Sequence, residues 1–370
     1  MKYGHFDDTN KEYIIQTPLT PTPWINYLGN QGFYGLISQS GGGYTFYEDA
    51  KLRRLTRYRY NQVPNDQSGR FYYISDGQDI WNPGYLPMKT KLDHYTSRVG
   101  MGYTIIESKK NNVSTSIKFF IPLSDQIEIH HVSIKNESND KKNIDLHSFI
   151  EWNLWNATDD QTNFQRNLNI GEVEVDQHTI YHKTEYRERR NHYAFFHVNQ
   201  EIKGFDTDRL AFLGLYQGMH EPDVVLNHKS HQSIASGGSP IASHYLSFDL
   251  EPQEEKTLVF LLGYIENDKE DKFDHNHLIN KTKAHKLINK YDDDTKVDAA
   301  FNELNMYWET LLSKFHVDSS DEKLNRMVNI WHQYQVMATF NLSRSASYYE
   351  SGTGRGIGFR DSCQDILGFV

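Results

Sequence analysis

The feature that most constrains the fold is a long series of short strand-like segments with no helix between them. From residue 1 to about residue 270, these segments alternate or run apolar, and turn-forming clusters such as NPGYLP and GGSP separate them. The segments are TFYEDAKLRRLTRYRY, GRFYYISDG, STSIKFFIPL, IEIHHVSIKN, IDLHSFIEWNLW, HYAFFHV, SHYLSFDL and KTLVFLLGYIE. Successive strands without crossover helices favour antiparallel pairing. The sequence therefore predicts a mainly β chain with a large antiparallel β-sandwich over residues 1–270.

Past the strand region, the pattern changes to helices. HLINKTKAHKLINKY, residues 277–291, is typical of a polar helix. Three aspartates follow it, and Thr295 is then a candidate N-cap for a second helix, in which apolar residues recur at helical spacing as far as Phe315. We therefore expect a helical linker over residues 271–317.

A third helix and a new domain, residues 318–370, are predicted after the linker. Ser319 and Glu322 are spaced as a capping box, in which two side chains satisfy the first backbone N–H groups of a helix. The segment EKLNRMVNIWHQYQVMATF then places apolar residues, Trp331 among them, on one helix face. Because one helix cannot bury such a face alone, we expect the residues from about 318 onward to be poorly ordered in solution.

The charge balance argues against nucleic acid and membranes as partners. The formal net charge is −10, whereas nucleic acid and anionic lipid attract basic surfaces. Two basic stretches, residues 51–60 and 186–190, do not change this conclusion. In the first stretch, arginines and tyrosines alternate as on a two-faced strand, so we expect them in a sheet face or a subunit contact.

Nothing in the sequence indicates secretion, a membrane span or a metal. Cys363 is the one cysteine, which excludes an internal disulfide. The opening MKYGHFDDTN lacks the apolar stretch of a signal peptide, and no run approaches the ~20 apolar residues that a membrane span needs. We therefore expect a cytoplasmic protein without a cofactor. The 24 tyrosines suit strands, and they also suit sites that stack and hydrogen-bond a sugar.

The densest chemical signal is GTGRGIGFRDSCQDILGFV, near the end of the sequence. Its glycine spacing, after a helical pattern rather than a strand, fits neither a dinucleotide fingerprint nor a P-loop, but glycines do permit close approach of a ligand to the backbone. Arginine suits phosphate, and an aspartate accepts hydrogen bonds from sugar hydroxyls. A sugar-phosphate site and a set of structural ion pairs both fit the charged residues here. These residues are Arg344, Arg355, Arg360, Asp361 and Asp365.

Long stretches of the chain resemble glycoside hydrolase family 94, the inverting disaccharide phosphorylases. NLSRSASYYESGTGRGIGFRDSCQD and EKLNRMVNIWHQYQ resemble the start of its catalytic domain. Upstream, TPWINYLGNQGFYGLISQSGGGYTFYEDAKLRRLTRYRYN, FIEWNLWNATDDQTNFQRNLNIGEVEV and YHKTEYRERRNHYAFF match as well. The resemblance spans essentially all 370 residues and is stronger to the members that act on cellobiose than to those that act on cellodextrins or chitobiose. It implies a β-sandwich, a helical linker and an (α/α)6 barrel, of which these residues contain only the first helix or so.

The resemblance also implies roles for single residues of the catalytic segment. Arg344 corresponds to the arginine that grips inorganic phosphate. Arg355 and Asp361 correspond to the pair that holds the non-reducing glucose in the cleavage subsite. Cys363 departs from the asparagine expected at its position, which puts the local hydrogen bonding in doubt.

A homodimer is implied too, in which the sandwich of one subunit borders the active site of the other. Tyr47, Asn156 and Asn163 are candidates for that contribution. Turn and strand residues that satisfy the local backbone are an equally good interpretation of these three.

The activity implied is the conversion of cellobiose and phosphate into α-D-glucose 1-phosphate and glucose, with no cofactor. The family's general acid, and a histidine and a threonine that also bind phosphate, correspond to no position in residues 1–370. We therefore expect this stretch to be inactive alone, as the N-terminal portion of a truncated phosphorylase. A carbohydrate-binding sandwich without catalysis, or an assembly subunit, is the alternative.

Overall fold

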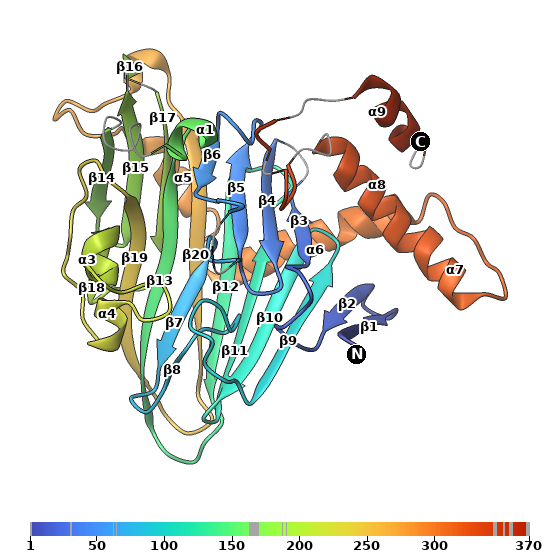
Figure 1. The fold of residues 1–370 in the computed structure, drawn as a ribbon, viewed down its shortest axis with the longest axis horizontal. Coiled ribbons are helices and arrows are strands. Elements are labelled where there is room, and N and C mark those ends of the chain that lie inside the picture. Colours follow the sequence, from blue (N-terminus) through green and yellow to red (C-terminus); the bar gives the residue numbers. More distant parts are fainter. Residues whose placement is uncertain are drawn as a thin grey trace.

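The structure, a computed structural model, describes residues 2–29, 32–61, 63, 65–162, 170–186, 188–189, 191–342, 346–350, 352–354 and 358–367, without the side chains of 170, 185, 186, 188, 189 and 365. Two large antiparallel sheets face each other, and helices from the last quarter of the chain lie behind one sheet and beyond its edge (Figure 1). The predicted fold class, a large antiparallel sandwich followed by helices, is confirmed.

The larger sheet has 11 strands in the described residues. In sheet order they are β1 (Gly4–Asp7), β2 (Glu12–Ile15), β9 (His94–Gly100), β10 (Tyr103–Lys110), β11 (Val113–Phe120), β12 (Ile127–Asn136), β20 (Glu255–Glu266), β17 (His192–Val198), β15 (Thr179–Tyr186) and β14 (Ile170–Asp176), with β16 (Glu188–Arg189) paired to β15. Strands β9 to β12 form a meander, and the pairing of β12 with β20 then joins distant parts of the chain.

The smaller sheet has nine strands in the same residues. They are β18 (Gly204–Asp208), β19 (Pro240–Leu250), β13 (Lys142–Trp155), β6 (Arg54–Thr56), β5 (Gly43–Tyr47), β4 (Phe33–Ser38) and β3 (Ile25–Leu28), with β7 (Phe71–Ser75) paired to β13 and β8 (Ile80–Trp81) paired to β7.

The strand expected through Tyr60 is shorter than predicted, because β6 ends at Thr56. Beyond it, the buried Arg57 pairs with Glu151 and with Asp160, the latter at 3.2 Å. These two ion pairs draw the arginine into the fold, so the alternation of arginine and tyrosine does not produce a two-faced strand here.

A hydrogen-bonded charge network lies in the core between the sheets. Arg70 and Glu128 form a fully buried ion pair, and Thr45 Oγ1 donates to Glu128 Oε2 at 2.6 Å. Because a carboxylate only accepts, His130 must donate through Nε2, which lies 2.9 Å from Glu128 Oε1, and its Nδ1 then accepts from the Tyr72 hydroxyl at 2.6 Å. The network ties β5, β7 and β12 together across both sheets.

Helices from the last quarter of the chain cover the outer face of the larger sheet, whereas two short helices of the strand region pack on the smaller sheet. The helical elements are α1 (Ala157–Asp160), α3 (Arg209–Leu213), α4 (Asp223–Leu226), η1 (Lys269–Asp271), α5 (Thr282–Ile288), α6 (Asp294–Leu312), α7 (Glu322–Arg326), the π-helical turn η2 (Met327–Trp331), α8 (His332–Asn341) and α9 (Phe359–Ile366). Figure 1 shows α6 crossing behind the strands, where Leu304 and Trp308 join a core with Tyr103 and Ile129 of the sheet. No helix in the described ranges is both long and apolar enough to cross a membrane.

The caps of the helices differ from the predicted ones. Asp293, not Thr295, caps α6, because its side chain accepts from the Lys296 N–H. Asp321, not Ser319, caps α7. In both places an aspartate two residues away competed with the predicted cap, and aspartate is among the strongest N-cap residues.

The first predicted helix begins later than expected. It was predicted from residue 277 but starts at Thr282. The residues before it are held to the sheet: the Ile279 N–H donates to Glu174 at 3.0 Å, and the Asn280 carbonyl accepts from the Tyr193 hydroxyl at 3.0 Å. These tertiary hydrogen bonds outweigh the helical pattern.

The expectation that the Trp331 face lacks a partner is wrong. Trp331 is 6% exposed and packs edge-on against Phe6 of β1, with ring centroids 5.6 Å apart. One turn further, the buried Tyr334 hydroxyl donates to Asn26 Oδ1 at 2.8 Å or to the Tyr27 carbonyl at 2.9 Å. The sandwich therefore buries the apolar face that the sequence pattern left without a partner.

Candidate active site

The segment that follows α8 is anchored to the sandwich by tyrosine hydroxyls. The Tyr44 hydroxyl donates to the Ser347 carbonyl at 3.0 Å, and the Tyr58 hydroxyl donates to the Tyr348 carbonyl. The Tyr348 ring packs edge-on against Tyr58, with centroids 5.2 Å apart, and is 5% exposed. Residues 346–350 thus lie on the face of the sandwich formed by β5 and the chain after β6.

Two glycines of the terminal pattern differ in their surroundings. Gly352 has a φ of +67°, and a Cβ atom there would lie 2.4 Å from the Ala50 side chain. It is a glycine because its backbone is left-handed and lies directly on the sandwich. Gly354 has no atom within 4 Å of such a Cβ, so its surroundings are open. Gly352 therefore allows the backbone to lie against the sandwich, whereas the space beside Gly354 is open.

Asp361 is the predicted site residue of this segment that the structure describes. It lies in the first turn of α9, partly exposed, where a carboxylate is favoured by the helix dipole. Its Oδ2 would lie 3.0 Å from a Cβ on Gly358, so the carboxylate folds back over the helix start. Arg344 and Arg355 lie outside the described residues, so the choice between a sugar-phosphate site and structural ion pairs stays open.

An open groove adjoins the glycine segment. It has a volume of about 810 Å³, within the range of ligand pockets. Tyr60 and Tyr349 meet in it edge-on at 5.6 Å and are 49% and 54% exposed. Exposed aromatic rings with amides and charged groups around them suit a sugar. The groove is lined by Arg59, Tyr60, Asn61, Gln161, Tyr349, Glu350, Thr353 and Gly354.

The sequence did not single out these groove residues. The only sequence feature that pointed to a sugar groove was the abundance of tyrosine, and abundance does not show which rings stay exposed. Tyr60 and Tyr349 are almost 300 residues apart, and no local spacing relates them. Only the docking of residues 346–350 on the sandwich brings the two rings together.

Tyr47, predicted to border a partner's site, lies at the end of β5. Its ring stacks on Tyr264 of β20, with centroids 4.6 Å apart and planes 22° apart. Tyr264 in turn meets Trp155 edge-on at 5.7 Å. Burial raises the pKa of the Tyr47 hydroxyl, and the neighbouring Glu48 raises it further. The structure thus brings Tyr47 close to the end of β13, where Asn156 follows.

Asn156 is the N-cap of α1. Its Oδ1 accepts from the N–H groups of Thr158, at 3.0 Å, and Asp159, at 3.2 Å. This is the local backbone role that the sequence left as an alternative. Asn163, the third candidate of that set, lies outside the described residues. The assignment of these three residues to a partner's site stays a prediction.

The remaining predicted residues lie on the surface of α9. Arg360 and Cys363 are exposed there, and the side chain of Asp365 is not described. Within the described parts of the chain, no group of three or more His, Cys, Asp or Glu residues is arranged to hold a metal ion.

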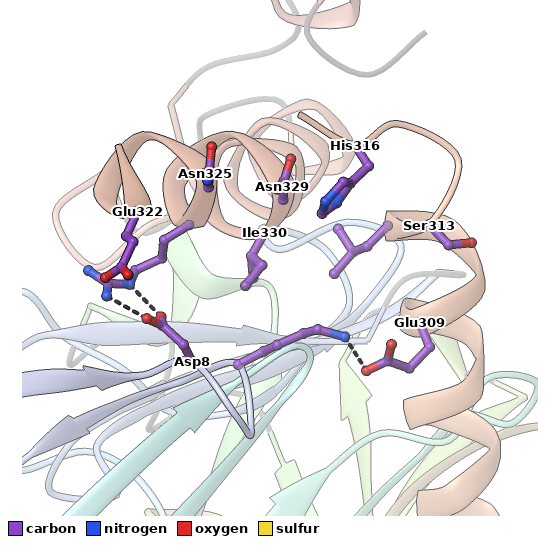
Figure 2. Close-up of a pocket in the computed structure, with 11 residues that line it drawn as sticks. Asp8, Glu309, Ser313, His316, Glu322, Asn325, Asn329 and Ile330 are labelled. Atoms are coloured by element: carbon purple, nitrogen blue, oxygen red, sulfur yellow. Dashed lines mark hydrogen bonds and ion pairs between the residues drawn. The ribbon is translucent and has the colours of Figure 1, made fainter. Parts of the chain in front are cut away.

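A second hollow, of about 440 Å³, lies away from the predicted site residues. Figure 2 shows Asp8 on the β1–β2 hairpin and Glu309 on α6 at its walls, with Ile330 between them. Asp8 pairs with Arg326 of α7, and Glu309 pairs with Lys11 of the hairpin. These contacts clamp the hairpin between α6 and α7, so we interpret the hollow as part of the seat of α7 on the sandwich.

Comparison with known families decides the relationship. A family model described as glycosyl hydrolase 94, supersandwich domain, matches residues 11–294. The chain belongs to glycosyl hydrolase family 94. The catalytic-domain model of the glycosyl hydrolase 94 superfamily matches residues 307–370. The resemblance to this family is therefore confirmed, while the stronger likeness to its cellobiose-specific members and the boundaries predicted at residues 270 and 317 stay predictions.

Similar proteins in this family are disaccharide phosphorylases. The chain is 30% identical over 380 residues to N,N'-diacetylchitobiose phosphorylase of Vibrio furnissii, and 25% identical over 371 residues to 3-O-β-D-glucopyranosyl-β-D-glucuronide phosphorylase of Paenibacillus borealis. The matches cover 99% and 100% of this chain but 44% of each relative. The chain thus spans less than half the length of these relatives.

A solved structure named for kojibiose phosphorylase, from the human microbiome, has the same fold. It aligns with a TM-score of 0.55 over 91% of this chain and 42% of that one. At 11% sequence identity, this likeness concerns the fold alone.

Proposed function

We propose that residues 1–370 form the sandwich and the first part of the catalytic domain of a cellobiose phosphorylase, which converts cellobiose and phosphate into α-D-glucose 1-phosphate and glucose with inversion. The observation that carries the proposal is the placement of the segment matched to the catalytic domain. Its described parts dock on the sandwich, and an open tyrosine-lined groove ends at Gly354, one residue before Arg355. In this proposal the domains are residues 1–270, 271–317 and 318–370, and the protein is a homodimer.

The residue types fit an inverting phosphorolysis. Phosphate is already a nucleophilic anion, so the protein must position it and neutralise its charge rather than deprotonate it. Arg344 supplies a guanidinium for that purpose. Arg355 and Asp361 hold hydroxyls of the non-reducing glucose while the ring flattens towards an oxocarbenium-like transition state. The acid that protonates the leaving oxygen is assigned to no residue of this stretch.

The site assignment predicts a specific binding defect. Asp361→Asn keeps the size of the side chain but removes the charged acceptor, so cellobiose binding to the 370-residue chain in saturating phosphate should weaken at least ~10-fold, the scale of a lost hydrogen bond to a charged group. Titration calorimetry measures this. Asp298→Asn, on the exposed face of α6, is the matched control and should bind as the unmodified chain does.

Other outcomes of that titration are equally informative. Cellobiose binding that survives in Asp361→Asn would favour the alternative of a carbohydrate-binding sandwich. Tighter binding of N,N'-diacetylchitobiose than of cellobiose would show that the donor sugar is wrongly assigned.

Turnover provides a separate prediction. The 370-residue chain should release no glucose 1-phosphate from cellobiose and phosphate, because none of its residues is assigned as the general acid. A coupled assay for glucose 1-phosphate checks this. Appreciable turnover would mean that the acid lies within these residues.

A further inference from the structure

Described residues on either side of Arg344 in the sequence contact the sandwich. On the N-terminal side, Tyr334 of α8 is anchored by Asn26 and Tyr27 of β3. The C-terminal anchor, residues 346–350, is bound by the tyrosine hydroxyls described above. The chain between the two anchors is therefore short, and its ends are set by the sandwich.

Asp66 is the polar centre of the second anchor. The Ser38 hydroxyl donates to its Oδ2 at 2.6 Å, and the Tyr348 hydroxyl donates to its Oδ1 at 3.3 Å. Asp66 is 5% exposed, and its backbone has a φ of +63°. A Cβ on Gly42 would lie 1.8 Å from Oδ1, so a glycine is needed there to make room for the carboxyl group. The fold thus builds a fitted niche for one buried carboxyl group, and Tyr348 closes it.

We propose that Asp66 and Tyr348 form a latch that positions the segment carrying Arg344 and Arg355, so that two sandwich-facing side chains act as positioning residues of the phosphorylase site. The inference rests on the proposed function for the role of those arginines. Neither latch residue contacts substrate in this scheme; Asp66 is too deeply buried to serve as the acid.

The surroundings of Asp66 make the latch sensitive to pH. Burial is the largest influence and raises its pKa to about 6, although the hydrogen bonds from Ser38 and Tyr348 lower it. Among the described residues, no basic side chain forms an ion pair with Asp66. The titratable and charged groups around it are Tyr348 above it, Tyr58 after β6, Tyr95 on β9 and, beyond Tyr58, Arg54 over the Tyr44 ring. Only Asp66 in this set titrates near neutral pH.

The direction of the effect follows from the raised pKa. An open latch admits water to Asp66 and returns its pKa towards the ordinary value of 3.8, whereas the closed latch favours the protonated carboxyl group. Closure is therefore fully favoured below pH 4 and weakens as the pH rises to about 6. Each pH unit in that interval changes the closing equilibrium constant by at most tenfold, so the whole interval changes it by at most ~100-fold.

Hydrogen exchange of the 370-residue chain at pH 4, 5, 6 and 7 tests the latch, with protection factors corrected for the intrinsic rate. Amides of residues 346–350 should lose protection between pH 4 and 6 in the unmodified chain and change little above that. Asp66→Asn, which keeps an acceptor but cannot ionise, should abolish that dependence. Tyr348→Phe should lower protection at every pH. Tyr216→Phe and Asp249→Asn, two changes of the same kind at exposed positions away from the groove, should behave as the unmodified chain.

Phosphate affinity, measured by calorimetry at pH 6, distinguishes a positioning role from a purely structural one, because a purely structural role would leave it unchanged. Tyr348→Phe should weaken phosphate binding several-fold at a temperature where all variants are folded, and the exposed control Tyr216→Phe should not. Unchanged protection in both latch variants, or a pH dependence that persists in Asp66→Asn, would overturn the latch. A latch that behaves as expected in a chain that binds no phosphate would refute the proposed function and, with it, the positioning role, while leaving the pH-sensitive docking established.

Discussion

At the scale of single residues, the faces of β12 show why a pattern of alternation can be assigned to the wrong side. In IEIHHVSIKN, Ile127 and Ile129 alternate with Glu128 and His130, and the period alone does not say which pair faces the sandwich core. In the structure, the two isoleucines face the helices, and Glu128 and His130 face the other sheet. Both faces are buried over the first four residues of the strand, because the helices cover the outer one there. The sequence shows the period but not which face has a second layer.

The buried pair of Arg70 and Glu128 should dominate the stability of the sandwich. Arg70→Met leaves Glu128 buried without its cation, which costs about 3–5 kcal/mol, and adding Glu128→Leu should recover most of that loss. Although burial alone would raise the pKa of Glu128, Arg70 and His130 outweigh it and hold the pKa well below its ordinary value. The pair therefore stabilises the fold above pH 4.5, and its contribution is lost as the pH falls below that value.

Urea unfolding of the two Arg70 variants measures this difference. Lys141→Met, which removes an exposed partner of Asp249, is the control and should leave the unfolding midpoint unchanged. A loss in Arg70→Met no larger than in that control would show that the buried network contributes little.

At the scale of elements, the strand-rich region, the three long helical patterns and their order were predictable from periodicity, whereas element boundaries were not. The expectation of no helix between the strands is wrong, because the short helices α1, α3 and α4 lie there, and α9 was not predicted either. The errors at Thr295 and Ser319 arose because aspartates stand within two residues of each, and local sequence does not rank neighbouring caps. The early start predicted for α5 is wrong for a different reason. Ile279 donates to Glu174, and Asn280 accepts from Tyr193, so these two residues are held to the sheet before the helix begins.

The cap of α6 can be tested with a matched pair. Asp293→Ala removes the acceptor for the Lys296 N–H and should lower the thermal midpoint by roughly 2 °C, the effect expected for a lost N-cap in a chain of this length. Thr295→Ala, inside the first turn, should leave the midpoint unchanged or raise it slightly, because alanine is the better helix former. A larger drop in the thermal midpoint for Thr295→Ala than for Asp293→Ala, measured by calorimetry, would show that Thr295 is the cap.

At the scale of the whole molecule, the sequence could not show that the catalytic segment is built on the sandwich. The contacts of Tyr44 with Ser347 and of Tyr334 with Asn26 join residues more than 300 positions apart. No periodicity relates such residues, so the sequence alone left the Trp331 face without a partner; poor order from about residue 318 onward stays a prediction. Family resemblance supplied Arg344, Arg355 and Asp361; the structure adds the surface on which their segment is held.

The central claim is that this surface and segment together bind phosphate and the non-reducing glucose. A crystal structure of the 370-residue chain with phosphate and cellobiose bound tests it most directly. The account predicts phosphate on Arg344 and the glucose ring between Arg355 and Asp361, beside the groove of Tyr60 and Tyr349. Phosphate bound elsewhere, or these three side chains closed into ion pairs with no room for a sugar ring, would contradict it.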